Sequence, residues 1–137
     1  MAPTLVRDIM TQKVFTVRFD KKLIAVREIM QWAHIRHVPV VSAAGGLVGI
    51  ISHRDLLHAA ISSVATVPPI ERNQHLGSVP IVQVMKTEVQ TIAPESTLRD
   101  AAAIMRKSKI GCLPVVENGK LIGIISEYDL LGLVEHT

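Results

Sequence analysis

The sequence has few aromatic residues, one cysteine and no long hydrophobic run, and each shortage excludes a class of protein. Only four of its 137 residues are Phe, Trp or Tyr, whereas proteins that bind single-stranded nucleic acid stack successive bases on aromatic rings. Cys112 has no second cysteine with which to form a disulfide, which predicts a reducing compartment. No apolar stretch approaches the roughly 18 residues of a membrane-spanning helix, and the N-terminus does not resemble a secretory signal. We therefore expect a cytoplasmic protein with neither a membrane nor a nucleic-acid partner.

What the sequence does contain is the composition of a folded domain, with 48% hydrophobic and 20% charged residues. The net charge of +3 is uneven, because residues 1–57 carry eight Lys or Arg and four Asp or Glu, whereas residues 80–137 carry six and seven. An excess of basic residues that is confined to the first half of the chain does not predict the extended basic surface that nucleic acid requires. It predicts instead that the two halves of the chain differ in charge.

The two halves repeat one pattern. At an offset of 75 residues Ile29-Met30 aligns with Ile104-Met105, and after a one-residue deletion Gly49-Ile50-Ile51-Ser52 aligns with Gly123-Ile124-Ile125-Ser126. The repeated unit is roughly 55 residues long, a period that must be recognised before any fold is assigned. The predicted boundaries are residues 1–62 for the first repeat, 63–80 for a connector and 81–137 for the second repeat.

Each repeat predicts the element order β-α-β-β-α. In the first repeat the spacing of Leu23, Val26 and Met30 places three apolar side chains on one helix face, and Asp20 is a candidate cap for that helix. The second repeat has the same features at Leu98, Ala101 and Met105, with Ser96 or Thr97 as the cap. The expected strands lie at residues 14–17, 37–41 and 47–52, and at residues 89–92, 113–117 and 121–126.

These elements predict a mixed α+β fold. A sheet this small cannot bury both of its faces alone. We therefore expect the two repeats to pack through their sheets with pseudo-twofold symmetry.

The last helix of each repeat begins with Ser-x-x-Asp, as Ser52 and Asp55 in the first repeat and Ser126 and Asp129 in the second. One interpretation is a capping box, in which the serine and aspartate side chains accept hydrogen bonds from backbone N–H groups. The other is a ligand site, because a carboxylate there can accept both hydroxyls of a ribose, while the helix N-terminus attracts phosphate. The pattern alone leaves both interpretations open.

Two series of fragments in the same order resemble the CBS domain. The first series is Asp8-Ile9-Met10-Thr11, Thr16-Val17, Ile29-Met30, Val38-Pro39-Val40-Val41, Gly49-Ile50-Ile51-Ser52 and Asp55-Leu56. The second is Val84-Met85, Thr91-Ile92, Ile104-Met105, Leu113-Pro114-Val115-Val116, Gly123-Ile124-Ile125-Ser126 and Asp129-Leu130. The chain therefore resembles a stand-alone tandem pair of CBS domains, also called a Bateman module.

This resemblance implies a regulatory sensor with no catalytic cofactor and two clefts for an adenosyl ligand. AMP, ADP or ATP is the expected ligand, with S-adenosylmethionine and NAD(H) as alternatives. One implied cleft combines Ser126, Asp129, Thr16, Arg36, His37 and Val38. The other combines Ser52, Asp55, Thr91, Gly111, Cys112 and Leu113. Further candidates for contacts with phosphate are His53, Arg54 and Tyr128.

Two other classes of function compete with this interpretation. Catalysis has little support, because no Gly-x-Ser-x-Gly elbow or phosphate-binding glycine loop occurs and the lone cysteine is typical of a small buried side chain. His34 and His37 have no matching metal ligand in the second repeat, so we expect no metal site. An interaction module with empty clefts is the second alternative. The resemblance also implies a homodimer and an unidentified effector protein, with interface candidates at Leu56, Leu57, Leu130, Leu131 and Leu133.

Overall fold

The computed structural model describes residues 4–63 and 76–135, and the chain divides into two compact units. Phe15–Val89 forms one of them, here called the first-repeat unit. Met1–Val14 and Gln90–Thr137 together form the other, the second-repeat unit. None of the helices in the described ranges is long and apolar enough to cross a membrane.

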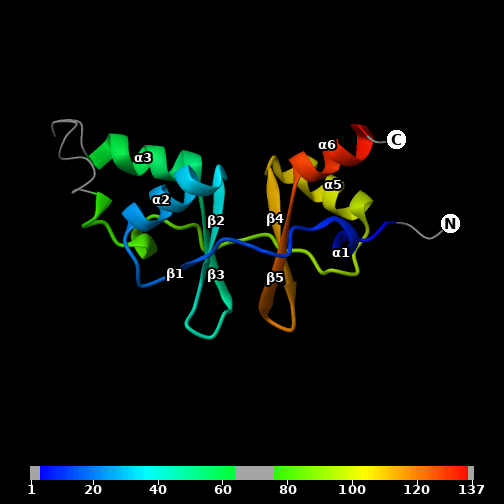
Figure 1. The fold of residues 1–137 in the computed structure, drawn as a ribbon, viewed down its shortest axis with the longest axis horizontal. Coiled ribbons are helices and arrows are strands. Elements are labelled where there is room, and N and C mark those ends of the chain that lie inside the picture. Colours follow the sequence, from blue (N-terminus) through cyan, green and yellow to red (C-terminus); the bar gives the residue numbers. More distant parts are fainter. Residues whose placement is uncertain (1–3, 64–75, 136–137) are drawn as a thin grey trace. The chain divides into compact units, whose positions relative to one another are not determined.

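The first-repeat unit is a three-stranded sheet with two helices beside it (Figure 1). Strand β1 (Val17–Arg18) runs parallel to β2 (His37–Val41), which pairs antiparallel with β3 (Leu47–Ser52). The helices are α2 (Leu23–Ala33) and α3 (His53–Ser63). The element order β-α-β-β-α matches the prediction, although β1 lies further along the chain than the predicted residues 14–17, and the sheet order is β1-β2-β3.

The second-repeat unit has the same plan. An antiparallel hairpin of β4 (Cys112–Glu117) and β5 (Lys120–Ser126) packs with α5 (Leu98–Ser108) and α6 (Glu127–Glu135). The hairpin turn places Asn118 and Gly119 at φ values of 53° and 79°, a left-handed conformation that these residue types tolerate. The strand predicted at residues 89–92 is reduced to a single bridge between Ile92 and Val115.

Each unit has its own hydrophobic core, and the predicted helix faces point into it. Leu23, Val26 and Met30 are buried in the core of the first-repeat unit. Leu98, Ala101 and Met105 are buried in the core of the second-repeat unit. The helical spacing of apolar residues was therefore sufficient to identify the buried face of both helices.

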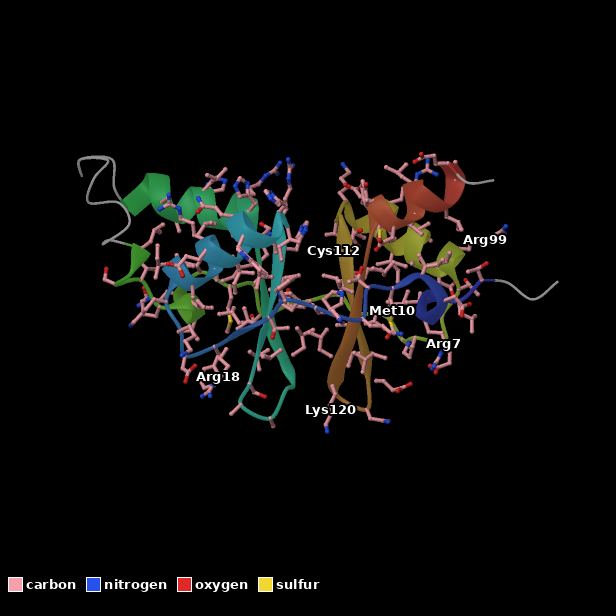
Figure 2. All side chains as sticks on the ribbon, viewed as in Figure 1. Arg7, Met10, Arg18, Arg99, Cys112 and Lys120 are labelled. Carbon is pink, nitrogen blue, oxygen red and sulfur yellow. The ribbon has the colours of Figure 1, made fainter. Side chains whose placement is uncertain are left out.

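The two units exchange their leading segments. Helix α1 (Val6–Ile9) belongs to the second-repeat unit, where Val6 is fully buried and its N–H donates to the carbonyl oxygen of Ser96 over 2.8 Å. Arg7 on this helix, labelled in Figure 2, forms an ion pair with Glu95. In the first-repeat unit, the short helix η2 (Ile81–Gln83) buries Ile81 in the core. The boundaries of the two sequence repeats therefore differ from the boundaries of the two compact units.

The predicted helix caps are correct in one repeat and wrong in the other. Thr97 caps α5, accepting a 3.1 Å hydrogen bond from the N–H of Asp100. Asp20 does not cap α2, because the helix begins after Lys22, and the Asp20 carboxylate instead accepts a 2.8 Å bond from Arg18. Residues 64–75 of the predicted connector lie outside the described residues.

Candidate functional site

The two Ser-x-x-Asp pairs form capping boxes at the starts of α3 and α6. In the first-repeat unit the N–H of Asp55 donates to Oγ of Ser52 over 3.1 Å, and the N–H of Ser52 donates to Oδ2 of Asp55 over 2.9 Å. In the second-repeat unit the corresponding distances between Asp129 and Ser126 are 3.2 and 2.8 Å. Both carboxylates are thereby fixed in one orientation at the point where a strand passes into a helix.

Capping uses only one oxygen of each carboxylate. Oδ2 of Asp55 and Oδ2 of Asp129 accept the backbone bonds, and Oδ2 of Asp129 also accepts a 3.1 Å bond from the Ser126 hydroxyl. The second oxygen, Oδ1, is left out of the cap in both. A carboxylate oxygen has lone pairs for two donors, so Oδ1 can accept hydroxyl groups without disturbing the helix start. Capping and ligand binding are compatible in this geometry.

Strand pairing brings other predicted residues to the Asp55 box. His37 on β2 pairs with Ser52 at the end of β3, and the N–H of His53 donates to the carbonyl oxygen of Arg36 over 2.7 Å. Arg36, His53 and the adjacent Arg54 are exposed, and His37 is half-buried. The residues whose backbone adjoins the start of α3 are therefore mostly basic.

The same pairing builds the Asp129 box from different side chains. Cys112 on β4 pairs with Ser126, and the N–H of Glu127 donates to the carbonyl oxygen of Gly111 over 2.9 Å. Tyr128, in the first turn of α6, is 81% exposed. The backbone is the same as at the Asp55 box, but the basic side chains are absent from these matched positions.

Cys112 lies on β4 (Figure 2) and is 6% exposed. Burial, with a smaller contribution from the negative charge of Glu127, raises the pKa of its thiol from 9.0 to about 12. A thiol with so high a pKa stays protonated near neutral pH and is a poor nucleophile. Cys112 therefore fits the small buried side chain that the sequence predicted.

The remaining predicted residues lie in these two units as follows. Val38 and Leu113 are fully buried core residues, so only their backbone atoms are left for contact with a ligand. Thr16 is half-buried ahead of β1, and Thr91 is exposed beside Ile92. The predicted combinations of Ser126 and Asp129 with Arg36, and of Ser52 and Asp55 with Gly111, join residues of different units and stay predictions.

Lys86 lies next to Asp55, although no sequence motif singled it out. Its Nζ is 3.7 Å from Oδ1 of Asp55, and its backbone exchanges two 3.0 Å hydrogen bonds with Ile50 on β3. Thr11 holds the matching position in the second-repeat unit, with bonds of 2.9 and 3.0 Å to Ile124. The offset of 75 residues that aligns the repeats also aligns Thr11 with Lys86, and this alignment was the available signal.

A close approach of backbone holds both segments in place. A Cβ atom built on Gly49 would lie 2.7 Å from Sδ of Met85 and 2.9 Å from the carbonyl oxygen of Lys86. At Gly123 it would lie 2.6 Å from Sδ of Met10, which is labelled in Figure 2. Glycine in the second strand of each hairpin, β3 or β5, thus allows the exchanged segment to reach the sheet.

The histidines and carboxylates of residues 4–63 and 76–135 are spread out. Within these ranges no three His, Cys, Asp or Glu side chains gather as they would around a metal ion. His34 ends α2 at a φ of 56°, and His37 continues into β2. The described side chains thus offer no ready-made set of metal ligands.

Comparison with known proteins gives consistent matches along the chain. A family model described as CBS domain matches residues 6–62 and 81–136. A CBS domain-containing protein of Dictyostelium discoideum is 34% identical over 131 residues, which make up 95% of this chain and 90% of that protein. Homoserine O-acetyltransferase of Methanococcoides burtonii is 32% identical over 96% of this chain, but the match spans only 24% of that enzyme. This last likeness therefore carries no catalytic activity over to the chain.

Solved structures share the fold. A Vibrio cholerae protein with a provisional assignment to acetoin utilization is 36% identical, with a TM-score of 0.83 over 98% of this chain and 93% of its own. The CBS domain pair of protein MJ0100, in complex with 5′-methylthioadenosine and S-adenosyl-L-methionine, is 25% identical. Its TM-score is 0.81, and the match covers 98% of each chain. The mixed α+β fold predicted from the sequence is confirmed.

Proposed function

The chain belongs to the CBS domain family, and on that basis we propose that it is a regulatory module that binds an adenosyl ligand without changing it chemically. The observation that carries this proposal is the Oδ1 atom of Asp55 and of Asp129. Each of these oxygens is positioned by a capping box that uses only Oδ2. Two hydroxyl groups of a ribose are suitable donors for such an oxygen.

The chemical class of the ligand is supported by a relative. The MJ0100 pair was solved with 5′-methylthioadenosine and S-adenosyl-L-methionine, which share adenine and ribose with AMP, ADP and ATP. We propose that the adenosine part is recognised at the Asp55 and Asp129 boxes. Occupancy would then be read by an effector protein, in keeping with a sensor that has no catalytic role.

The test compares three aspartate variants by isothermal titration calorimetry with AMP, ATP, S-adenosylmethionine and 5′-methylthioadenosine. Asp55→Ala and Asp129→Ala each remove a carboxylate proposed to bind ribose. Loss of charge-assisted hydrogen bonds should weaken binding at the affected site by roughly 10- to 150-fold.

Asp100→Ala is the matched control, because Asp100 forms the same capping box with Thr97 at the start of α5 but has no proposed ligand. It loses a cap of the same kind and should keep its affinity for all four ligands. Equal affinities in the wild type, Asp55→Ala and Asp129→Ala would show that the boxes only cap helices. In that case a module with empty clefts would replace this proposal.

A second candidate function is homodimerisation, which the surface of α6 favours. Tyr128 and Leu131 are 81% and 64% exposed and lie three residues apart, on one side of the helix. In the predicted set, Leu56 is buried, Leu130 is packed against the core, and Leu57 and Leu133 are exposed. An apolar helix face of this kind is suited to a partner of the same sequence.

A further inference from the structure

The Asp55 and Asp129 boxes share one backbone arrangement, so their side chains can be compared position by position. Three backbone contacts define the match. His37 pairs with Ser52 as Cys112 pairs with Ser126. The N–H that follows each serine donates to the carbonyl oxygen of Arg36 or Gly111. Lys86 and Thr11 each exchange two hydrogen bonds with the isoleucine two residues before the serine.

At these matched positions the two boxes have opposite charge. At the matched backbone positions the Asp55 box has Arg36, His37, His53, Arg54 and Lys86. Around Asp129 the corresponding side chains are Gly111, Cys112, Glu127, Tyr128 and Thr11. The matched set of the Asp55 box thus contains three permanent cations and two histidines, of which Lys86 contacts the Asp55 carboxylate, whereas the matched set of the Asp129 box contains the carboxylate of Glu127 and no cation.

From this contrast we infer that the two boxes select adenosyl ligands by the charge of the 5′ substituent, an inference that rests on the proposed function. The Asp55 box takes anionic, phosphate-bearing ligands such as AMP. The Asp129 box takes neutral or cationic ones such as 5′-methylthioadenosine or a sulfonium nucleoside. Lys86 is the specificity-determining residue of the Asp55 box.

The position of Lys86 allows its ammonium group to pair either with Asp55 or with the 5′-phosphate of a ligand. Its Nζ lies 3.7 Å from Oδ1 of Asp55, and the lysine side chain is 68% exposed. The Asp55 side chain is only 16% exposed, but the contact is long and its cation stays in solvent, so the pair contributes little to stability and a ribose can take over Oδ1 at small cost. The released ammonium sits on a flexible four-carbon stem and can follow the ribose to a 5′-phosphate, where its positive charge is again paired.

The experiment first measures each box separately and then exchanges Lys86 and Thr11, the two residues at the matched position. Asp129→Ala isolates the Asp55 box and Asp55→Ala isolates the Asp129 box, and calorimetry measures AMP and 5′-methylthioadenosine on each. These probes share adenine and ribose and differ in the charge of the 5′ substituent. The preference for AMP should be at least about tenfold greater at the Asp55 box.

Lys86→Thr, made in the Asp129→Ala background, should weaken AMP binding by about 5- to 20-fold and change 5′-methylthioadenosine binding by less than about twofold. Thr11→Lys, in the Asp55→Ala background, should strengthen AMP binding at the other box. Both substitutions keep the backbone bonds of the segment, because those bonds involve only main-chain atoms.

The control is Lys22→Thr, since Lys22 is an exposed lysine of the same unit that also forms a backbone bridge, with Pro80. It should leave AMP affinity unchanged.

The outcomes separate this inference from the function on which it rests. If ligand binding depends on Asp55 and Asp129 but the two boxes prefer AMP equally, only the charge inference is overturned. The same conclusion follows if Lys86→Thr weakens AMP and 5′-methylthioadenosine by the same factor. If neither aspartate variant alters the binding of any adenosyl ligand, the proposed function is overturned and the charge inference falls with it.

Discussion

At the scale of single residues, the thiol of Cys112 makes the stability of the protein depend on alkaline pH. Burial first, and the charge of Glu127 second, raise its pKa from 9.0 to about 12. The folded protein therefore holds the thiol proton more tightly than the unfolded chain. The contribution of the protonated thiol to the free energy of unfolding is full below pH 9 and is lost as the pH rises towards 12. The free energy of unfolding should fall by about 1.4 kcal/mol per pH unit over this window, relative to Cys112→Ala. Urea denaturation at pH 8, 9, 10 and 11 measures the difference.

Glu127→Gln tests the order of the two causes. Removal of this charge should leave the onset of the alkaline fall near pH 9 and bring its upper end to a slightly lower pH, because burial is the larger cause of the raised pKa. A stability difference between the wild type and Cys112→Ala that stays constant from pH 8 to 11 would contradict the raised pKa.

The residue scale also shows which parts of the site can be predicted from the sequence. Ser52 and Asp55 were identifiable because a capping box is a local pattern with fixed spacing. Lys86 reaches Asp55 from 31 positions along the chain, and no periodicity relates the two residues. The alignment of Lys86 with Thr11 relates the two segments to each other, but the contact of Lys86 with Asp55 is seen only in the folded chain.

At the scale of elements, Gly49 on β3 and Gly123 on β5 should tolerate a side chain poorly, whereas a helical glycine should accept one. A Cβ on Gly49 would meet the carbonyl oxygen of Lys86 at 2.9 Å, and backbone cannot move aside as a flexible side chain does. Gly49→Ala should therefore destabilise the protein by about 1–3 kcal/mol. At Gly123 the nearest backbone atom, the carbonyl oxygen of Thr11, would be 3.1 Å away. Gly123→Ala should cost less, and thermal denaturation ranks the two.

Gly132 in α6 provides the opposite control. A Cβ there would have no heavy atom within 4 Å, and alanine is favoured over glycine in a helix by about 1 kcal/mol. Gly132→Ala should accordingly raise the free energy of unfolding.

If Gly49→Ala is as stable as the wild type, the segment that contains Lys86 is not held against β3 as described.

Element boundaries show where local sequence signals stop being sufficient. Thr97 caps α5, but Asp20 bonds to Arg18 and α2 starts later, after Lys22. Both residue types are good caps, so the choice depends on which neighbour competes for the side chain. That competition is decided by the folded backbone around β1 and not by the spacing of apolar residues.

At the scale of the whole molecule, the repeat was predictable and the exchange of segments was not. The two copies are recognisable from aligned fragments, and the elements of both hairpins follow from them. The assignment of α1 to the second-repeat unit and of η2 to the first-repeat unit depends on long-range burial of Val6 and Ile81. Each segment is short and carries only a few apolar residues, so hydrophobicity alone does not assign it to one core or the other.

The largest-scale prediction concerns self-association through α6. Tyr128 and Leu131 expose apolar surface on one side of this helix, and in a twofold interface each residue is buried twice. Loss of roughly 1.5 kcal/mol of burial per copy amounts to about 3 kcal/mol, so Leu131→Glu should weaken a dimer by roughly 100-fold. Val82→Glu is the matched control, because Val82 is a 48% exposed apolar residue on η2. Sedimentation velocity should find dimers for the wild type and Val82→Glu but monomers for Leu131→Glu at micromolar concentration, whereas a monomeric wild type would contradict the dimer outright.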